Sequence, residues 1–92
     1  MKGKTASLRR TIRLAPGHQL QADSSGSGHT LMSPKGPIQV NETAATILSL
    51  CDGTHTREEI VERIVRARGG SLADDVRAFL TAAERRGWIV EG

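Results

Sequence analysis

The chain has 92 residues and a formal net charge of +3, with 37% hydrophobic residues and only two aromatic side chains, Phe79 and Trp88. A chain of this length forms one small domain with a core made mostly of Leu, Ile, Val and Ala, which leaves little room for a deep catalytic pocket. No apolar run approaches the roughly 20 residues that span a bilayer and one cysteine cannot form an internal disulfide, so we expect a cytoplasmic protein without membrane contact.

The first residues divide into a tail and the start of a domain. Residues 1–7 are small, polar or basic, which predicts a disordered basic tail before a single domain at 8–92. In "RTIRLAPGHQLQA" at 10–22 apolar and polar residues alternate. Pro16 and Gly17 fit a type II turn, since Pro presets φ at its second position and Gly accepts positive φ at the third. The segment predicts two short strands or one bent strand.

Two more strands are expected after a flexible loop. "DSSGSG" at 23–28 has nothing to bury and predicts a loop. "TLMS" at 30–33 and "IQV" at 38–40 have strand composition, and together they predict a small antiparallel sheet. Pro37 has no backbone donor, so the last strand is expected at a sheet edge.

From Asn41 the apolar period lengthens to that of a helix. Asn41 is a good N-cap, and the first helix is expected to end at Asp52-Gly53. Thr56 and Glu59 have capping-box spacing for a second helix, which Gly69-Gly70 ends. The expected buried stripes are Ala44, Ile47, Leu48 and Cys51 in the first helix and Ile60, Val61, Ile64 and Val65 in the second.

A third helix is predicted from Ser71, whose spacing to Asp74 resembles a capping box. Gly87 suits the left-handed residue after the helix, and Trp88 is expected to fold back on Ala83. A small N-terminal antiparallel sheet followed by three helices is an α+β fold close to a winged helix-turn-helix. The side chains expected to be buried on the third helix are Leu72, Val76, Phe79, Leu80 and Ala83.

Chemical sites are few. Cys51 and His55 are the one nucleophile-and-base candidate, but Cys51 continues an apolar stripe, which favours an inert core thiol, and the polar turn around His55 favours a surface side chain. A metal needs three or four clustered ligands, whereas His18, His29 and His55 lie in separate loops. The acids of the second helix suit its dipole and a solvated face: Glu58, Glu59 and Glu62. We therefore predict no catalytic residue, no metal, no cofactor and no enzymatic activity.

The charge distribution leaves DNA binding as an alternative without favouring it. Five of the 13 basic residues lie in the first 13 positions, so residues 14–92 hold eight bases against all ten acids. In a helix-turn-helix the recognition turn would be "SLADDV" at 71–76, where Asp74 and Asp75 would face phosphates. We therefore expect no nucleic-acid partner, and a winged-helix DNA-binding protein is the alternative.

The expected sheet edge has two interpretations. A disordered peptide could add as a strand to residues 36–40, with its side chains against the third helix. Equally, Pro34, Lys35 and Pro37 could protect the edge from such pairing. The residues alone leave both open.

Three segments together resemble a known family, the PqqD proteins of pyrroloquinoline quinone (PQQ) biosynthesis. The similarity covers about 80 residues, and its most specific element is the order of a Pro-Gly turn, an Asn-capped "AATILSLCDG", a Thr-led "TREEIV" and a terminal "GW". The matching segments are "RLAPGHQLQ" at 13–21, "HTLMSPKGPIQVNETAATILSLCDGTHTREEIV" at 29–61 and "DDVRAFLTAAERRGWI" at 74–89.

The resemblance implies a peptide chaperone, the recognition element for ribosomally made and modified precursor peptides (RiPPs). Such domains resemble winged helices, bind the precursor peptide PqqA and present it to the radical SAM enzyme PqqE. In related recognition elements the peptide adds to the third strand and lies against the third helix. Carried onto this chain, the expected peptide-binding residues are Ile38, Gln39 and Val40 on the strand and Arg77, Thr81 and Glu84 on the helix.

One departure concerns the segment after the first strands. Family members often carry an aromatic and acidic residues there, whereas this chain has "ADSSGSG" at 22–28. The Gly/Ser loop at 23–28 could act as a hinge through which the N-terminal strands exchange between two copies. A monomer and such a homodimer both stay open.

Overall fold

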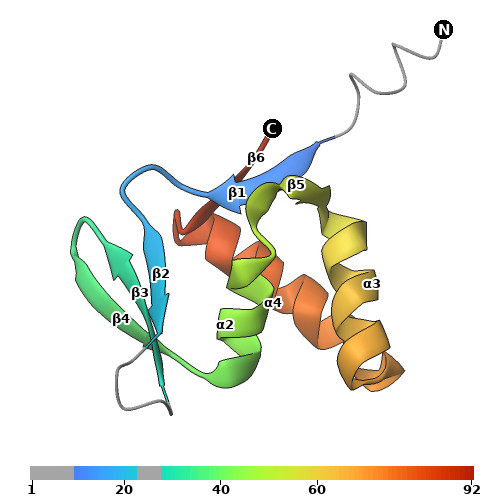
Figure 1. The fold of residues 1–92 in the computed structure, drawn as a ribbon. Coiled ribbons are helices and arrows are strands. Elements are labelled where there is room, and N and C mark those ends of the chain that lie inside the picture. Colours follow the sequence, from blue (N-terminus) through green and yellow to red (C-terminus); the bar gives the residue numbers. More distant parts are fainter. Residues whose placement is uncertain (1–9, 23–27) are drawn as a thin grey trace, which may run out of the picture.

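The computed structural model describes residues 10–22 and 28–92 (Figure 1). The predicted tail at 1–7 and nearly all of the predicted loop at 23–28 lie outside the described residues. No described helix has the length and apolar character needed to cross a membrane. In chain order the elements are β1 (Thr11–Leu14), β2 (Gln19–Ala22), β3 (His29–Ser33), β4 (Gly36–Val40), α2 (Glu42–Ser49), β5 (Asp52–Thr56), α3 (Arg57–Arg68), the 3₁₀ turn η1 (Gly70–Leu72), α4 (Ala73–Arg85) and β6 (Ile89–Glu91).

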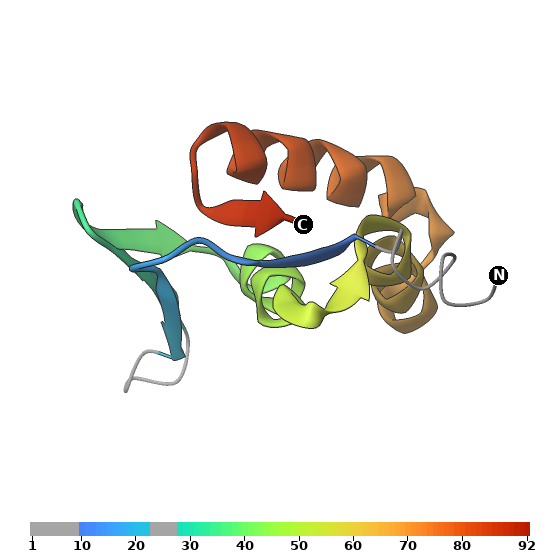
Figure 2. The same cartoon turned by 90° about the horizontal axis from the view of Figure 1, so that it is seen from above.

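The strands form two antiparallel sheets of three strands each. One has the order β2-β3-β4 and the other β5-β1-β6. The first sheet projects at one end of the molecule, away from α3 (Figures 1 and 2). A sheet beside three helices confirms the predicted α+β, winged-helix-like fold.

The Pro-Gly turn separates the two sheets. His18 N donates to Ala15 O at 3.0 Å, and Gly17 has a φ of 82°, as the predicted turn requires. A Cβ at Gly17 would lie 2.9 Å from Pro34 Cγ, so the absent side chain also lets the turn pack against the β3–β4 hairpin. Residues 11–14 and 19–22 are thus two strands, as one of the two predicted alternatives had it.

Strand β4 lies at a sheet edge, as Pro37 predicted. It pairs with β3 only, with Ile38 opposite Leu31 and Gln39 opposite Thr30. A two-residue turn at 34–35 connects the strands. Among the described residues, no strand pairs with the other edge of β4. That edge is therefore open to a further strand.

The predicted caps of the first two helices are present. Ala44 N donates to Asn41 Oδ1 at 2.8 Å at the start of α2. At the start of α3, Glu59 N donates to Thr56 Oγ1 at 3.2 Å and Thr56 N donates to Glu59 Oε1 at 2.8 Å. Gly69 ends α3 with a φ of 115°.

The predicted start of the third helix is wrong, whereas its predicted end is confirmed. Ser71 lies inside the 3₁₀ turn η1, and α4 begins at Ala73. The N-cap position is taken by Leu72, which has a helical backbone and no side-chain oxygen to cap the helix. At the other end Trp88 N donates to Ala83 O at 2.9 Å and Gly87 N to Glu84 O at 3.1 Å. This pair of bonds is the Schellman motif.

The joint between the first two helices differs from the prediction. Helix α2 ends at Ser49 rather than at Asp52-Gly53, and residues 52–56 form β5. β5 pairs with β1, where Ile12 lies opposite His55. The C-terminal strand β6 pairs with the other edge of β1.

One core joins both sheets to the helices. The predicted stripes of α2 and α3 are buried, except that Val65 is half-buried. Val76, Leu80 and Ala83 of α4 are fully covered. Leu72 of η1 and Phe79 of α4, both predicted to be buried, stay partly exposed. The fully buried large side chains are Ile12, Leu31, Ile47, Leu48, Ile60, Ile64, Leu80, Ile89 and Val76.

The cap of α2 allows a first test. Asn41→Ala leaves the Ala44 N–H without its side-chain partner, so we expect the free energy of unfolding to fall by about 1 kcal/mol. Urea unfolding followed by circular dichroism measures the change. Ser49→Ala, which removes an exposed hydroxyl near the other end of the helix, is the matched control and should change stability by less than about 0.5 kcal/mol. Equal losses would contradict a capping role.

Candidate functional site

The open edge of β4 is the first part of the candidate site. Gly36, Ile38 and Val40 are half-buried, whereas Pro37 and Gln39 are exposed, so the strand turns alternate side chains toward the core and solvent. A two-residue hairpin closes on a pair that exchanges its backbone hydrogen bonds, here Ser33 and Gly36, and such pairs alternate along the strands. By this alternation the backbone groups of Pro37 and Gln39 point to the open edge.

One hollow borders β4 itself, and a second begins at Asn41, directly after the strand. The hairpin hollow, about 310 Å³, lies between the β3–β4 hairpin and the end of α4, and the helix hollow, about 200 Å³, lies between α2 and α4. The hairpin hollow is lined by His18, residues 33–38, Arg86, Gly87 and Trp88. The helix hollow is lined by Asn41, Thr43, Ala44, Ile47, Leu72, Asp75, Val76 and Phe79.

An aromatic pair connects the two hollows. Phe79 lines the helix hollow and Trp88 lines the hairpin hollow, and their ring centroids are 6.5 Å apart. The hollows therefore adjoin along one side of α4. We call the two hollows and the β4 edge together the β4–α4 groove.

The predicted helix residues lie on the other side of α4. Arg57 of α3 donates to Glu84 Oε1 at 3.0 Å and to Thr81 Oγ1 at 3.5 Å. Arg77 donates to Glu58 of α3 at 3.3 Å, and this bond raises the pKa of Arg77. At 3.6 residues per turn, the side with Arg77, Thr81 and Glu84 is roughly half a turn from the side with Asp75, Phe79 and Arg86. The structure thus brings Ile38, Gln39 and Val40 to the groove without these three.

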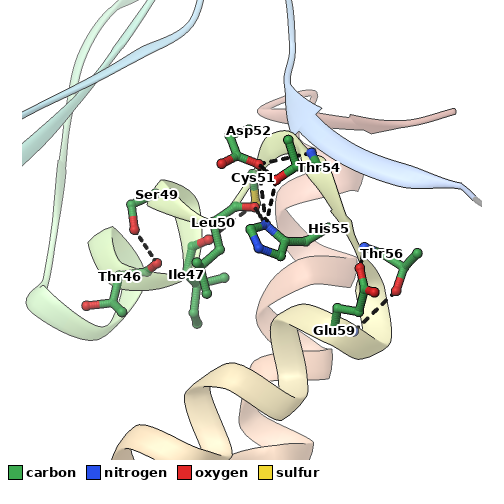
Figure 3. A network of polar contacts seen from close by, with 10 residues as sticks. All are labelled: Thr46, Ile47, Ser49, Leu50, Cys51, Asp52, Thr54, His55, Thr56 and Glu59. Atoms are coloured by element: carbon green, nitrogen blue, oxygen red, sulfur yellow. Dashed lines mark hydrogen bonds and ion pairs between the residues drawn. The ribbon is translucent and has the colours of Figure 1, made fainter.

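The Cys51 region has no reactive pair (Figure 3). Cys51 is 3% exposed, and its thiol donates to Ile47 O at 3.3 Å. Burial, with a smaller contribution from Asp52, raises the pKa of Cys51 from 9.0 to about 12. The predicted core thiol is confirmed.

The prediction of a surface position for His55 is wrong. Its side chain is only 15% exposed, because residues 52–56 form a strand and draw the ring toward the end of α2. His55 Nδ1 lies 3.1 Å from Leu50 O and 3.3 Å from Asp52 Oδ1. A hydrogen bond from Thr54, more than His55, lowers the pKa of Asp52. The imidazole therefore helps to hold the turn before β5.

Across residues 10–22 and 28–92, no three His, Cys, Asp or Glu side chains cluster as they would around a metal ion. His18 Nδ1 contacts Pro16 O at 3.2 Å, and His29 and His55 belong to different sheets. The histidines in this part of the chain therefore do not combine into a metal site.

Comparison with known proteins gives consistent results. Residues 28–89 match the family model "Coenzyme PQQ synthesis protein D (PqqD)". A "PqqA binding protein" of Methylococcus capsulatus is 38% identical over 81 residues, which is 87% of each chain. Another of Pseudomonas fluorescens is 34% identical and covers 80% of this chain and 84% of that protein. None of these descriptions supports the DNA-binding alternative.

Solved structures share the fold. The PqqD part of Methylobacterium extorquens PqqCD, described as a stand-alone RiPP recognition element, superposes with a TM-score of 0.68 at 21% identity, covering 86% of this chain and 87% of that one. The heterocyclase TruD contains a similar unit, with a TM-score of 0.69 at 18% identity, and this chain spans 12% of its length. Since the family model matches about two thirds of the chain and curated relatives match most of it, the chain belongs to the PqqD family of coenzyme PQQ synthesis proteins.

Proposed function

We propose that residues 8–92 act as one peptide-binding domain, which binds a PqqA precursor peptide by strand addition to β4 and presents it to the radical SAM enzyme PqqE. The carrying observation is the open edge of β4 beside two adjoining hollows. A relative that is 38% identical to this chain is named a PqqA binding protein, which supports the choice of peptide.

The backbone of β4 offers a specific pairing pattern. Gln39 N–H and C=O point to the open edge, whereas Pro37 offers only its carbonyl. Peptide pairing is therefore centred on Gln39. Ile38 and Val40 hold the strand to the core and face the same side as the peptide residues opposite them.

Side chains of the peptide would rest against α4. Phe79 and Asp75 are available there because they line a hollow, whereas Thr81 and Glu84 already bond Arg57. We therefore expect the peptide to contact the groove side of α4, where Phe79 and Asp75 lie. Contact by Arg77, Thr81 and Glu84 stays a prediction, and a Thr81→Ala variant tests part of it.

The proposed contribution to the pathway is order and proximity. A flexible peptide loses conformational freedom when it pairs with β4, so PqqE would meet it already extended. This role requires no cofactor or catalytic side chain on the chain itself. It is compatible with either a monomer or a homodimer that exchanges N-terminal strands.

Replacing Gln39 with proline tests strand addition. The change removes the outward N–H but no bond to β3, so we expect about fivefold weaker PqqA binding with the fold retained. Fluorescence anisotropy of a labelled PqqA peptide measures the affinity, and circular dichroism checks the fold.

Gln39→Ala is the matched control, because it removes the same side chain and keeps the N–H. It should bind within twofold of the unmodified protein. If the proline and alanine variants bind equally well, the peptide does not pair with β4, and the proposed mode of binding is wrong.

A further inference from the structure

The hairpin hollow is lined by basic side chains without an acid. His18, Lys35 and Arg86 contribute to its wall, and no lining residue is Asp or Glu. In residues 10–22 and 28–92, the carboxylates that form ion pairs are paired with other partners, so neither Lys35 nor Arg86 is neutralised by one of them. The hollow therefore has positive charge available for a ligand.

The Arg86 side chain and the backbone turn that carries Lys35 both have defined contacts. Arg86 Cζ lies 5.4 Å from the centroid of the Trp88 ring, which is a cation–π distance. Lys35 N donates to Ser33 Oγ at 3.2 Å, and Ser33 Oγ donates to Gly36 O at 2.7 Å, which fixes the hairpin turn. The hairpin backbone that carries Lys35 and the ring beside Arg86 are therefore in place before an anion binds.

The helix hollow has a different character. Most of its lining is apolar, including Ile47, Leu72, Val76 and Phe79, and its one charged residue is Asp75. An anionic side chain would be repelled there and a bulky apolar one would be covered. The two hollows therefore suit different side chains of a bound peptide.

Strand geometry limits the spacing between the two peptide residues that reach the hollows. On a strand added to β4, residues opposite 36, 38 and 40 turn their side chains to the same face as Gly36, Ile38 and Val40, which is the core side. Side chains that reach the two hollows are therefore an even number of positions apart in the peptide. A shift by one residue would send them to the solvent face.

We infer that the groove selects peptides by an acidic side chain bound in the hairpin hollow by Arg86 and Lys35, together with a bulky apolar side chain in the helix hollow on the same strand face. This inference rests on the proposed function and adds which kinds of peptide side chain the two hollows bind. The acid would accept hydrogen bonds from the Arg86 guanidinium and Lys35 ammonium, a charge-assisted contact that Glu or Asp can make and Gln makes weakly.

Charge reversal of Arg86 tests the acidic position. Arg86→Glu should weaken PqqA binding about fivefold in low salt, measured by anisotropy with the labelled peptide. Arg85→Glu is the matched control, since it makes the same charge change at the last residue of α4, directly before Arg86, but does not line the hollow. It should change the affinity by less than twofold. Lys35→Glu provides a second reversal away from the helix and should also weaken binding.

Peptide variants identify the partner. Replacing each acidic residue of PqqA in turn with lysine should give one peptide that binds the Arg86→Glu variant more tightly than it binds the unmodified protein. Equal losses for Arg85→Glu and Arg86→Glu, or no peptide with restored binding, would overturn the acidic position. The proposed function is tested separately by Gln39→Pro, which would still weaken binding if only the acidic position were wrong.

Discussion

In the folded protein, Cys51 should react with iodoacetamide at pH 8 about a thousandfold more slowly than in the unfolded chain. The thiolate is the reactive form. With a pKa of about 12 in the fold and 9.0 as the ordinary value, the thiolate fraction at pH 8 falls by about three powers of ten. Mass spectrometry of samples quenched over time, with and without denaturant, measures both rates.

Cys51 is the chain's one cysteine, so an introduced thiol gives a matched control. Ser49→Cys in a Cys51→Ala background places a thiol at an exposed position on α2, and it should be labelled at nearly the unfolded rate. Labelling of native Cys51 within tenfold of that control would contradict the buried, protonated thiol.

The raised pKa of Cys51 also makes the free energy of unfolding depend on pH. The unfolded chain releases the Cys51 proton near pH 9.0 and the folded chain only near pH 12. Unfolding therefore becomes more favourable as pH rises through this window, because the unfolded state then binds fewer protons. The stabilising contribution of the neutral thiol is complete below about pH 9 and is lost toward pH 12.

The starts of α2 and α3 could be predicted because their signals are local. Asn41, Thr56 and Glu59 form the expected caps, and the apolar stripes that follow them are buried except for the half-buried Val65. Strand β5 could not be predicted in this way. Residues 52–56 are "DGTHT", without apolar alternation, and they are a strand because β1, some 40 positions away in the chain, lies beside them.

The candidate site also has one part that local signals predict and one part that depends on tertiary packing. Pro37 is a local signal for an edge strand, and β4 is at the edge. On α4 the apolar period identifies a buried stripe but gives it two equivalent flanks. Which flank faces α3 and which faces β4 depends on tertiary packing. The predicted residues Arg77, Thr81 and Glu84 lie on the flank that bonds α3.

The partly exposed Phe79 distinguishes the two flanks by experiment. Its ring packs against Trp88 and lines the helix hollow, so a bound peptide would cover the part that remains exposed. Aromatic side chains covered in this way are frequent binding hot spots, worth about 2 kcal/mol. Phe79→Ala should therefore weaken PqqA binding about thirtyfold in a calorimetric titration.

Stability must be separated from binding in that variant, because Phe79 also packs against the core. Phe79→Leu keeps much of the apolar contact and should retain the fold while losing the aromatic pairing with Trp88, so its affinity should lie between those of Phe79→Ala and the unmodified protein. Thr81→Ala, on the flank that bonds α3, should change affinity by less than twofold. If Thr81→Ala weakens binding as much as Phe79→Ala, the peptide lies on the α3 side of α4, where Arg77, Thr81 and Glu84 would be its contacts.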